Sequence, residues 1–183
     1  MKKYFYLLSV IGILSACNPA VFFAKTAVTT SERGVEATAD DSRIVSSVRA
    51  NLADHDASLF ANINTQVNRG RVLLTGMVED RSAIGIAERE ARKVEGVKKV
   101  INEVKMKDPN ANYGDDAWIT TQIKSDHLTE TNLDTLDINV QTFNHVVYLF
   151  GTSPNTEQRS RAVSIARKVK GVTKVVNHLD IST

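Results

Sequence analysis

The sequence is poor in the features that build cross-linked or membrane-spanning proteins. It has a single cysteine among 183 residues, Cys17, so no disulfide can form within the chain. The apolar run at residues 4–14 is about half as long as the roughly 20 residues that a helix needs to cross a bilayer. Basic and acidic residues are nearly balanced, at 23 and 21, and 42% of the residues are hydrophobic. This composition is typical of a globular protein with one ordinary core or two small ones.

The first residues follow the order of a secretory signal. Lys2 and Lys3 give a positive start, the apolar run follows, and small residues precede Cys17. We therefore expect residues 1–16 to be a signal peptide that is removed on export. Leu14-Ser15-Ala16-Cys17 resembles the bacterial lipobox, which implies that Cys17 becomes the first mature residue and carries acyl chains. Several acyl chains give a stable anchor, since each buried CH₂ contributes about 0.8 kcal/mol. The alternative is a free or buried thiol.

The same resemblance implies a location. Asn18 follows the cysteine at the position where inner-membrane lipoproteins of enteric-type bacteria often have aspartate, so the outer membrane is favoured, with the folded part facing the periplasm. Residues 17–39 are rich in small and polar residues, and we expect them to form the lipidated cysteine and a tether. Within the tether, Val21-Phe22-Phe23 either rests at the membrane surface or docks on the folded part.

The charge balance indicates that any general attraction for nucleic acid is weak. All 21 acidic residues lie beyond Cys17, whereas removal of Lys2 and Lys3 leaves 23 − 2 = 21 basic residues. A nearly neutral mature chain attracts polyanions only weakly, so any anion site must come from local clustering of charge.

An internal repeat divides the rest of the chain. At an offset of 75 residues, Ile44 matches Ile119, Gln66 matches Gln141 and Gly76 matches Gly151. The same register holds through the longest block, in which residues 91–97 correspond to residues 166–172 and differ only at Glu95 and Lys170. Repeats of fixed period indicate repeated structural units. We predict two modules at residues 40–107 and 115–183, joined by a loop-forming linker at residues 108–114.

Each module is predicted to have the order helix, strand, strand, helix, strand. Asp41 and Asp116 are good residues to cap a first helix, and the apolar spacing that follows suits one helical face. Runs rich in β-branched residues predict strands at 63–67, 71–78, 137–142 and 146–151, with last strands after Gly96 and Gly171. The second helices are expected at 82–95 and 156–170. The predicted fold class is α+β: two tandem αββαβ sandwiches, each with two helices on a three-stranded mixed sheet.

This order and the repeated glycines resemble the BON domain, an αββαβ module of Gram-negative envelope proteins. Gly76 and Gly151, with the Val-x-Gly-Val ends of the second helices, carry the resemblance. Residues 118–125 after Gly114-Asp115-Asp116 are similar to outer-membrane lipoproteins with two BON domains. That similarity implies that the first helix of the second module binds anionic phospholipid such as phosphatidylglycerol, and that the protein supports envelope integrity, with division proteins as possible partners. The implied lipid-binding residues are Gly114, Asp115, Trp118, Ile119, Thr121, Lys124, Ser125 and Leu128.

The repeat offers an internal control for Trp118, the only tryptophan. Trp118 aligns with Arg43, so the position faces solvent in at least one module. An indole prefers membrane interfaces, where its ring is apolar and its N–H stays hydrogen-bonded. Lys124 is placed to reach a phosphate. The alternative is that Trp118 packs between the two modules.

A second asymmetry concerns the second helix of module two, which is basic where its counterpart is mixed. Basic residues near an anionic surface contribute about 1 kcal/mol each, so this helix either assists membrane binding or is a solvated face. Its basic residues are Arg159, Arg161, Arg167, Lys168 and Lys170.

The sequence contains no catalytic constellation, and we expect a non-enzymatic protein without cofactors. The four histidines are scattered and lack the spacing of zinc ligands, and the only cysteine precedes the modules. The αββαβ order also occurs in KH domains, but neither module has the Gly-x-x-Gly loop that clamps RNA. The remaining alternative to lipid binding is a periplasmic protein-interaction or chaperone-like role.

Overall fold

A computed structural model describes residues 32–109, 114–130 and 137–182, with side chains from residue 40 onward. These residues belong to one compact unit, Ser31–Thr183. Within it the order helix, strand, strand, helix, strand occurs twice, as predicted, with the last strand of the first module divided in two. The predicted leader, Cys17, the tether up to residue 31 and Val21-Phe22-Phe23 lie outside the described residues.

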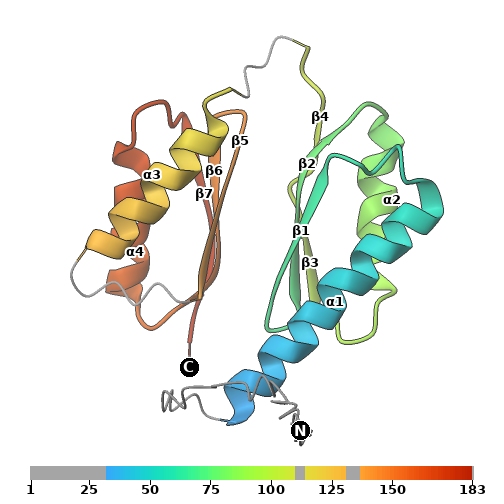
Figure 1. Cartoon of the computed structure of the whole chain (residues 1–183), viewed down its shortest axis with the longest axis horizontal. Coiled ribbons are helices and arrows are strands. Elements are labelled where there is room, and N and C mark those ends of the chain that lie inside the picture. Colours follow the sequence, from blue (N-terminus) through green and yellow to red (C-terminus); the bar gives the residue numbers. More distant parts are fainter. Residues whose placement is uncertain (1–31, 110–113, 131–136, 183) are drawn as a thin grey trace, which may run out of the picture. The chain divides into compact units, whose positions relative to one another are not determined.

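The first module is a mixed sheet with both helices on one face (Figure 1). Strands β1 and β2 form an antiparallel hairpin, whereas β3 and β4 pair with β2 in parallel after the α2 crossover. Its elements are α1 (Glu32–Asp56), β1 (Ile63–Asn68), β2 (Arg71–Val78), α2 (Arg81–Arg92), β3 (Lys99–Asn102) and β4 (Lys105–Met106).

The second module repeats this topology. Strand β6 lies in the middle of a three-stranded sheet, antiparallel to β5 and parallel to β7, and α3 and α4 cover one face (Figure 1). Its elements are α3 (Asp116–Thr129), β5 (Ile138–Phe143), β6 (Val146–Ser153), α4 (Thr156–Lys168) and β7 (Lys174–Ile181). The predicted fold class is therefore confirmed.

Each module has its own core between sheet and helices. Val72 and Leu74 of β2 belong to the first core, and Val147 and Leu149 of β6 belong to the second. Successive side chains of a strand point to opposite faces, so the residues between them must lie on the other side of each sheet.

That other side is also apolar, and there the two modules meet. Leu73 from β2 forms a buried cluster with Tyr148 and Phe150 from β6. Arg71 adds polar contacts: its guanidinium donates to the carbonyl oxygens of Gly151 and His178, lies 2.8 Å from a carboxylate oxygen of Asp180, and sits 5.2 Å from the centre of the Phe150 ring. An arginine with a side chain only 13% exposed is thus surrounded by partners that compensate its desolvation.

The prediction that Asp41 and Asp116 cap helices is wrong. The two residues share another role instead. Asp41 lies inside α1 and accepts the backbone N–H groups of Arg69 and Gly70. Asp116 is the first residue of α3 and accepts those of Asn144 and His145. All four turn residues have positive φ. Each aspartate therefore fastens the β-hairpin turn to the first helix of its module.

Other element bounds also differ from expectation. Helix α1 begins at Glu32, within the segment expected to be a tether. Helices α2 and α4 end at Arg92 and Lys168, before the predicted ends, and are capped at their starts by the side chains of Asp80 and Asn155. Gly96 and Gly171 do adopt positive φ, but in the turn that follows each helix.

The glycines shared by β2 and β6 are required by a close backbone approach. Gly76 has φ of 119°, a region that side chains rarely adopt, and a Cβ atom there would overlap the carbonyl oxygen of Asn62. Gly151 has φ of 135° and the same relation to the carbonyl oxygen of Asp137. These positions let the middle strand bend over the start of its hairpin partner.

We predict that Gly76→Ala lowers the free energy of unfolding by about 2 kcal/mol or more, because the alanine is strained and the Asn62 carbonyl must move. Gly85→Ala is the matched control. Gly85 lies within α2, and a Cβ there would meet only an Arg89 nitrogen at 3.6 Å. Urea unfolding followed by circular dichroism should show this variant unchanged or more stable by up to about 1 kcal/mol. Equal stability of the two variants would contradict the close approach.

Candidate functional site

The predicted lipid-binding residues lie on α3 and at its start, and most of them share an exposed face. Trp118, Thr121, Ser125 and Leu128 follow one another at spacings of three and four residues, which places them along one stripe of the helix. All four are exposed. Lys124 is also exposed and lies at the margin of this stripe.

The stripe contains unusually exposed apolar side chains. Trp118 is 52% exposed and Leu128 is 78% exposed. Among the described residues only one other large hydrophobic side chain, Met106, reaches the exposed class. With half of its surface exposed, Trp118 is not enclosed between the two modules, which was the alternative expectation for this residue. These two exposed apolar groups make the stripe a candidate binding surface.

Ile119 is the exception among the predicted residues. Its side chain is fully buried in the core of the second module, against Gly171. The Ile119 side chain therefore does not contact lipid as expected. It packs in the core and holds α3 against the second module. Gly114 and Asp115 precede the helix and are exposed, and the Asp115 carboxylate makes no capping hydrogen bond to it.

The same face of the first module is different. The positions of α1 that correspond to Trp118 and Leu128 hold Arg43 and Ala53, and the Arg43 side chain lies 3.9 Å from Asp40. Lys124 corresponds to Arg49, so both helices present a cation at this position. The apolar pair is thus confined to the second module, whereas the charge is common to both.

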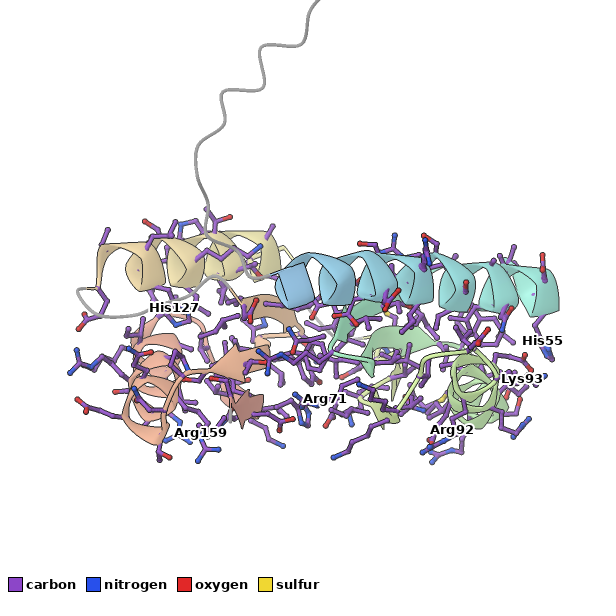
Figure 2. The ribbon with its side chains drawn as sticks, turned by 90° about the horizontal axis from the view of Figure 1, so that it is seen from below. His55, Arg71, Arg92, Lys93, His127 and Arg159 are labelled. Carbon is purple, nitrogen blue, oxygen red and sulfur yellow. The ribbon has the colours of Figure 1, made fainter. Side chains whose placement is uncertain are left out.

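His127, on the inner side of α3, is a core residue. Figure 2 labels His127 on the side of α3 that faces α4. The residue is only 2% exposed, and its Nε2 lies 3.1 Å from the carbonyl oxygen of Ala162 in α4. Burial lowers the pKa of His127 below its usual value of 6.5, and this effect outweighs the hydrogen bond to Ala162 and the charge of Asp126, which raise it. The corresponding residue of the first module is Leu52. His127 therefore fills space as a neutral imidazole that donates one hydrogen bond.

The basic helix α4 is less available than its sequence suggests. Arg161 lies within 3.4 Å of carboxylate oxygens of both Glu130 and Glu157. The exposed cations Arg167 and Lys168 of α4 lie at the C-terminal end of the helix, where positive charge interacts favourably with the helix dipole.

In the described ranges no group of three or more His, Cys, Asp and Glu side chains is placed to hold a metal ion. Those ranges also contain no helix that has the length and apolar character to cross a membrane.

The sequence family follows from a match to both modules. A model of the BON domain matches residues 40–108 and 115–183. The chain belongs to the BON domain family. Its tandem arrangement and the resemblance noted from Gly76 and Gly151 are thereby confirmed.

Two curated BON-type relatives are similar over long stretches. Outer membrane lipoprotein DolP of Haemophilus influenzae is 33% identical over 183 residues, which cover 96% of this chain and 94% of the relative. Osmotically-inducible protein Y of Escherichia coli is 34% identical over 144 residues, covering 76% of this chain and 72% of the relative. Among solved structures, the C-terminal domain of CdsD from Chlamydia trachomatis covers 73% of this chain and 96% of that domain, at 13% identity and a TM-score of 0.32.

A polar cluster beside α3 was not predicted from the sequence. The side-chain amides of Asn64 and Gln66 both donate hydrogen bonds to the side-chain carbonyl oxygen of Gln141. The only hint in the sequence was that Gln66 and Gln141 are equivalent positions of the repeat. Equivalence in a repeat does not indicate that the two residues are in contact.

We predict that the stability of the protein falls as the pH drops below about 6.5, the usual pKa of histidine, because the unfolded chain then binds a proton that buried His127 resists. His127→Leu, which restores the residue found at position 52, should reduce this dependence while keeping the core filled. Thermal unfolding at about pH 8 and about pH 5 measures both effects. An equally large loss of stability at low pH in the His127→Leu variant would show that other titratable groups cause the pH dependence.

Proposed function

We propose that this protein is a non-enzymatic outer-membrane lipoprotein, anchored through Cys17, that binds anionic phospholipid through α3 of its second BON domain. The acyl anchor supplies attachment to the membrane, and the helix recognises the lipid surface. On this proposal the protein faces the periplasm and supports envelope integrity, with a role at division sites as a further expectation.

One observation carries the proposal: α3 presents the Trp118 indole and the Leu128 isobutyl group to solvent along one stripe, with the Lys124 ammonium group at its margin. An indole at this exposure can lie among headgroups and upper acyl carbons with its N–H hydrogen-bonded. Leu128 adds apolar area, and the hydroxyl groups of Thr121 and Ser125 suit the polar part of the interface. Lys124 supplies the positive charge that an anionic surface attracts.

The lipoprotein part rests on sequence and on one relative. Leu14-Ser15-Ala16-Cys17 has the order of a lipobox, and the DolP of Haemophilus influenzae, whose name places it in the outer membrane, aligns over 96% of the chain. A permanent lipid anchor explains why a modest apolar stripe suffices for α3, because the helix then acts at high local concentration.

We predict that Trp118→Ala weakens binding to phosphatidylglycerol-containing vesicles by at least about tenfold, because removal of the indole forfeits roughly 1.5–3 kcal/mol of apolar burial. The test uses residues 18–183, which retain the whole compact unit, in vesicle co-sedimentation. In the unchanged protein, emission of the single tryptophan should shift to shorter wavelength on vesicle binding.

Arg43→Ala is the matched control, since Arg43 holds the corresponding position of the first module. It should bind vesicles as the unchanged protein does. Equal binding by the Trp118→Ala variant would remove α3 from the mechanism and favour the protein-interaction role, which pull-down from envelope extracts would then address.

A further inference from the structure

A groove with several amide and hydroxyl groups in its lining runs beside α3, between it and the edge of the first module. It has a volume of about 660 Å³, within the range of small-molecule sites, and is open to solvent. Asn64, Gln66 and Met77 of the first module line one side, and Thr120, Lys124 and Gln141 of the second line the other. Asp116 also lines the second side, but its carboxylate accepts the backbone N–H groups of the hairpin turn. A ligand in this groove would touch both BON domains.

The amides of the groove leave hydrogen-bonding capacity unused. The Gln141 carbonyl oxygen accepts from both Asn64, at 2.6 Å, and Gln66, at 3.1 Å. The amide nitrogen of Gln141 therefore has its two donors left, and it meets no acceptor in the part of the chain that the structure describes. The carbonyl oxygen of Gln66 is enclosed without any donor. Such an oxygen is unfavourable, and a rotation of the Gln66 amide that exchanges its hydrogen bond to Gln141 would offer the oxygen to a hydroxyl group in the groove.

Lys124 connects this groove to the exposed stripe of α3. At about 100° per residue, Lys124 and Ala117 lie between Thr120, which faces the groove, and the line of Trp118 and Leu128. Thr120 itself donates a hydrogen bond to the Thr142 hydroxyl at 2.8 Å. A phosphate held by Lys124 at the border could thus direct its polar substituent into the groove while the attached acyl chains stay beside Trp118.

We propose that the groove binds the polyol part of a phosphorylated polyol, and that this ligand is the phosphoglycerol headgroup of an anionic phospholipid. The inference rests on the proposed function and extends it: Lys124 pairs with the phosphate, and the amides of Gln66 and Gln141 exchange hydrogen bonds with the glycerol hydroxyls. The first BON domain then contributes headgroup selectivity, while α3 provides the general affinity for an anionic surface.

The test compares vesicles of equal surface charge that contain phosphatidylcholine with either phosphatidylglycerol or phosphatidylserine. The unchanged protein (residues 18–183) should prefer phosphatidylglycerol by about fivefold, the contribution of one or two hydrogen bonds. Gln66→Met and, independently, Gln141→Met should bring this ratio to about one. Gln158→Met is the matched control, because Gln158 in α4 also has an enclosed carbonyl oxygen without a partner but does not line the groove. Thermal unfolding verifies that each variant is folded.

A soluble probe separates the two sources of a phosphorylated polyol. Free sn-glycerol 3-phosphate should shift the side-chain amide resonances of Gln66 and Gln141 only at roughly millimolar concentration, because it lacks the effective concentration that the membrane provides. Tight binding of this probe that survives Trp118→Ala would overturn the lipid as the source. A ratio that Gln66→Met and Gln141→Met leave unchanged would overturn the groove itself. Neither result depends on whether Trp118→Ala abolishes vesicle binding, which tests the proposed function alone.

Discussion

Each sheet of this protein is apolar on both faces, but its own helices cover only one. Leu73, Tyr148 and Phe150 occupy the second faces, and the two modules bury these residues against each other. Buried on both sides, β2 and β6 read as continuous apolar runs instead of alternating ones. The helices are therefore kept on the far sides of the sheets, and this leaves the outer face of α3 accessible for a ligand.

The contact between modules has an approximate two-fold character. Gln66 hydrogen-bonds to Gln141, and Glu103 lies 3.0 Å from His178; in both pairs the partners are the same residue position of the repeat. Such self-pairing is the mark of an isologous interface, which is usually made by two identical chains. Arg71 breaks the symmetry, because its counterpart in the second module is Val146. The exposed indole is a second break in the symmetry, since it is present in one module only.

The fold was largely predictable from the sequence, because the pattern that predicts each element occurs in both modules of the repeat. The exposed face of α3 was also predictable, since Trp118 aligns with a charged residue. Asp41 and Asp116 were misassigned because an aspartate near a helix start suits either a helix cap or a distant turn, and only the spatial approach of the hairpin decides between them. Ile119 was placed among the lipid-binding residues by resemblance, although its apolar spacing already indicated the core.

The sequence was sufficient to predict the two modules, their element order and the helix that differs between them, because these features depend on local propensity and on comparison of one copy with the other. Tertiary structure alone decided which residues of the two copies touch. The groove of Asn64, Gln66 and Gln141 exists only because two sheet edges and α3 converge there, and residues that lie 75 or more positions apart carry no mark of such an approach.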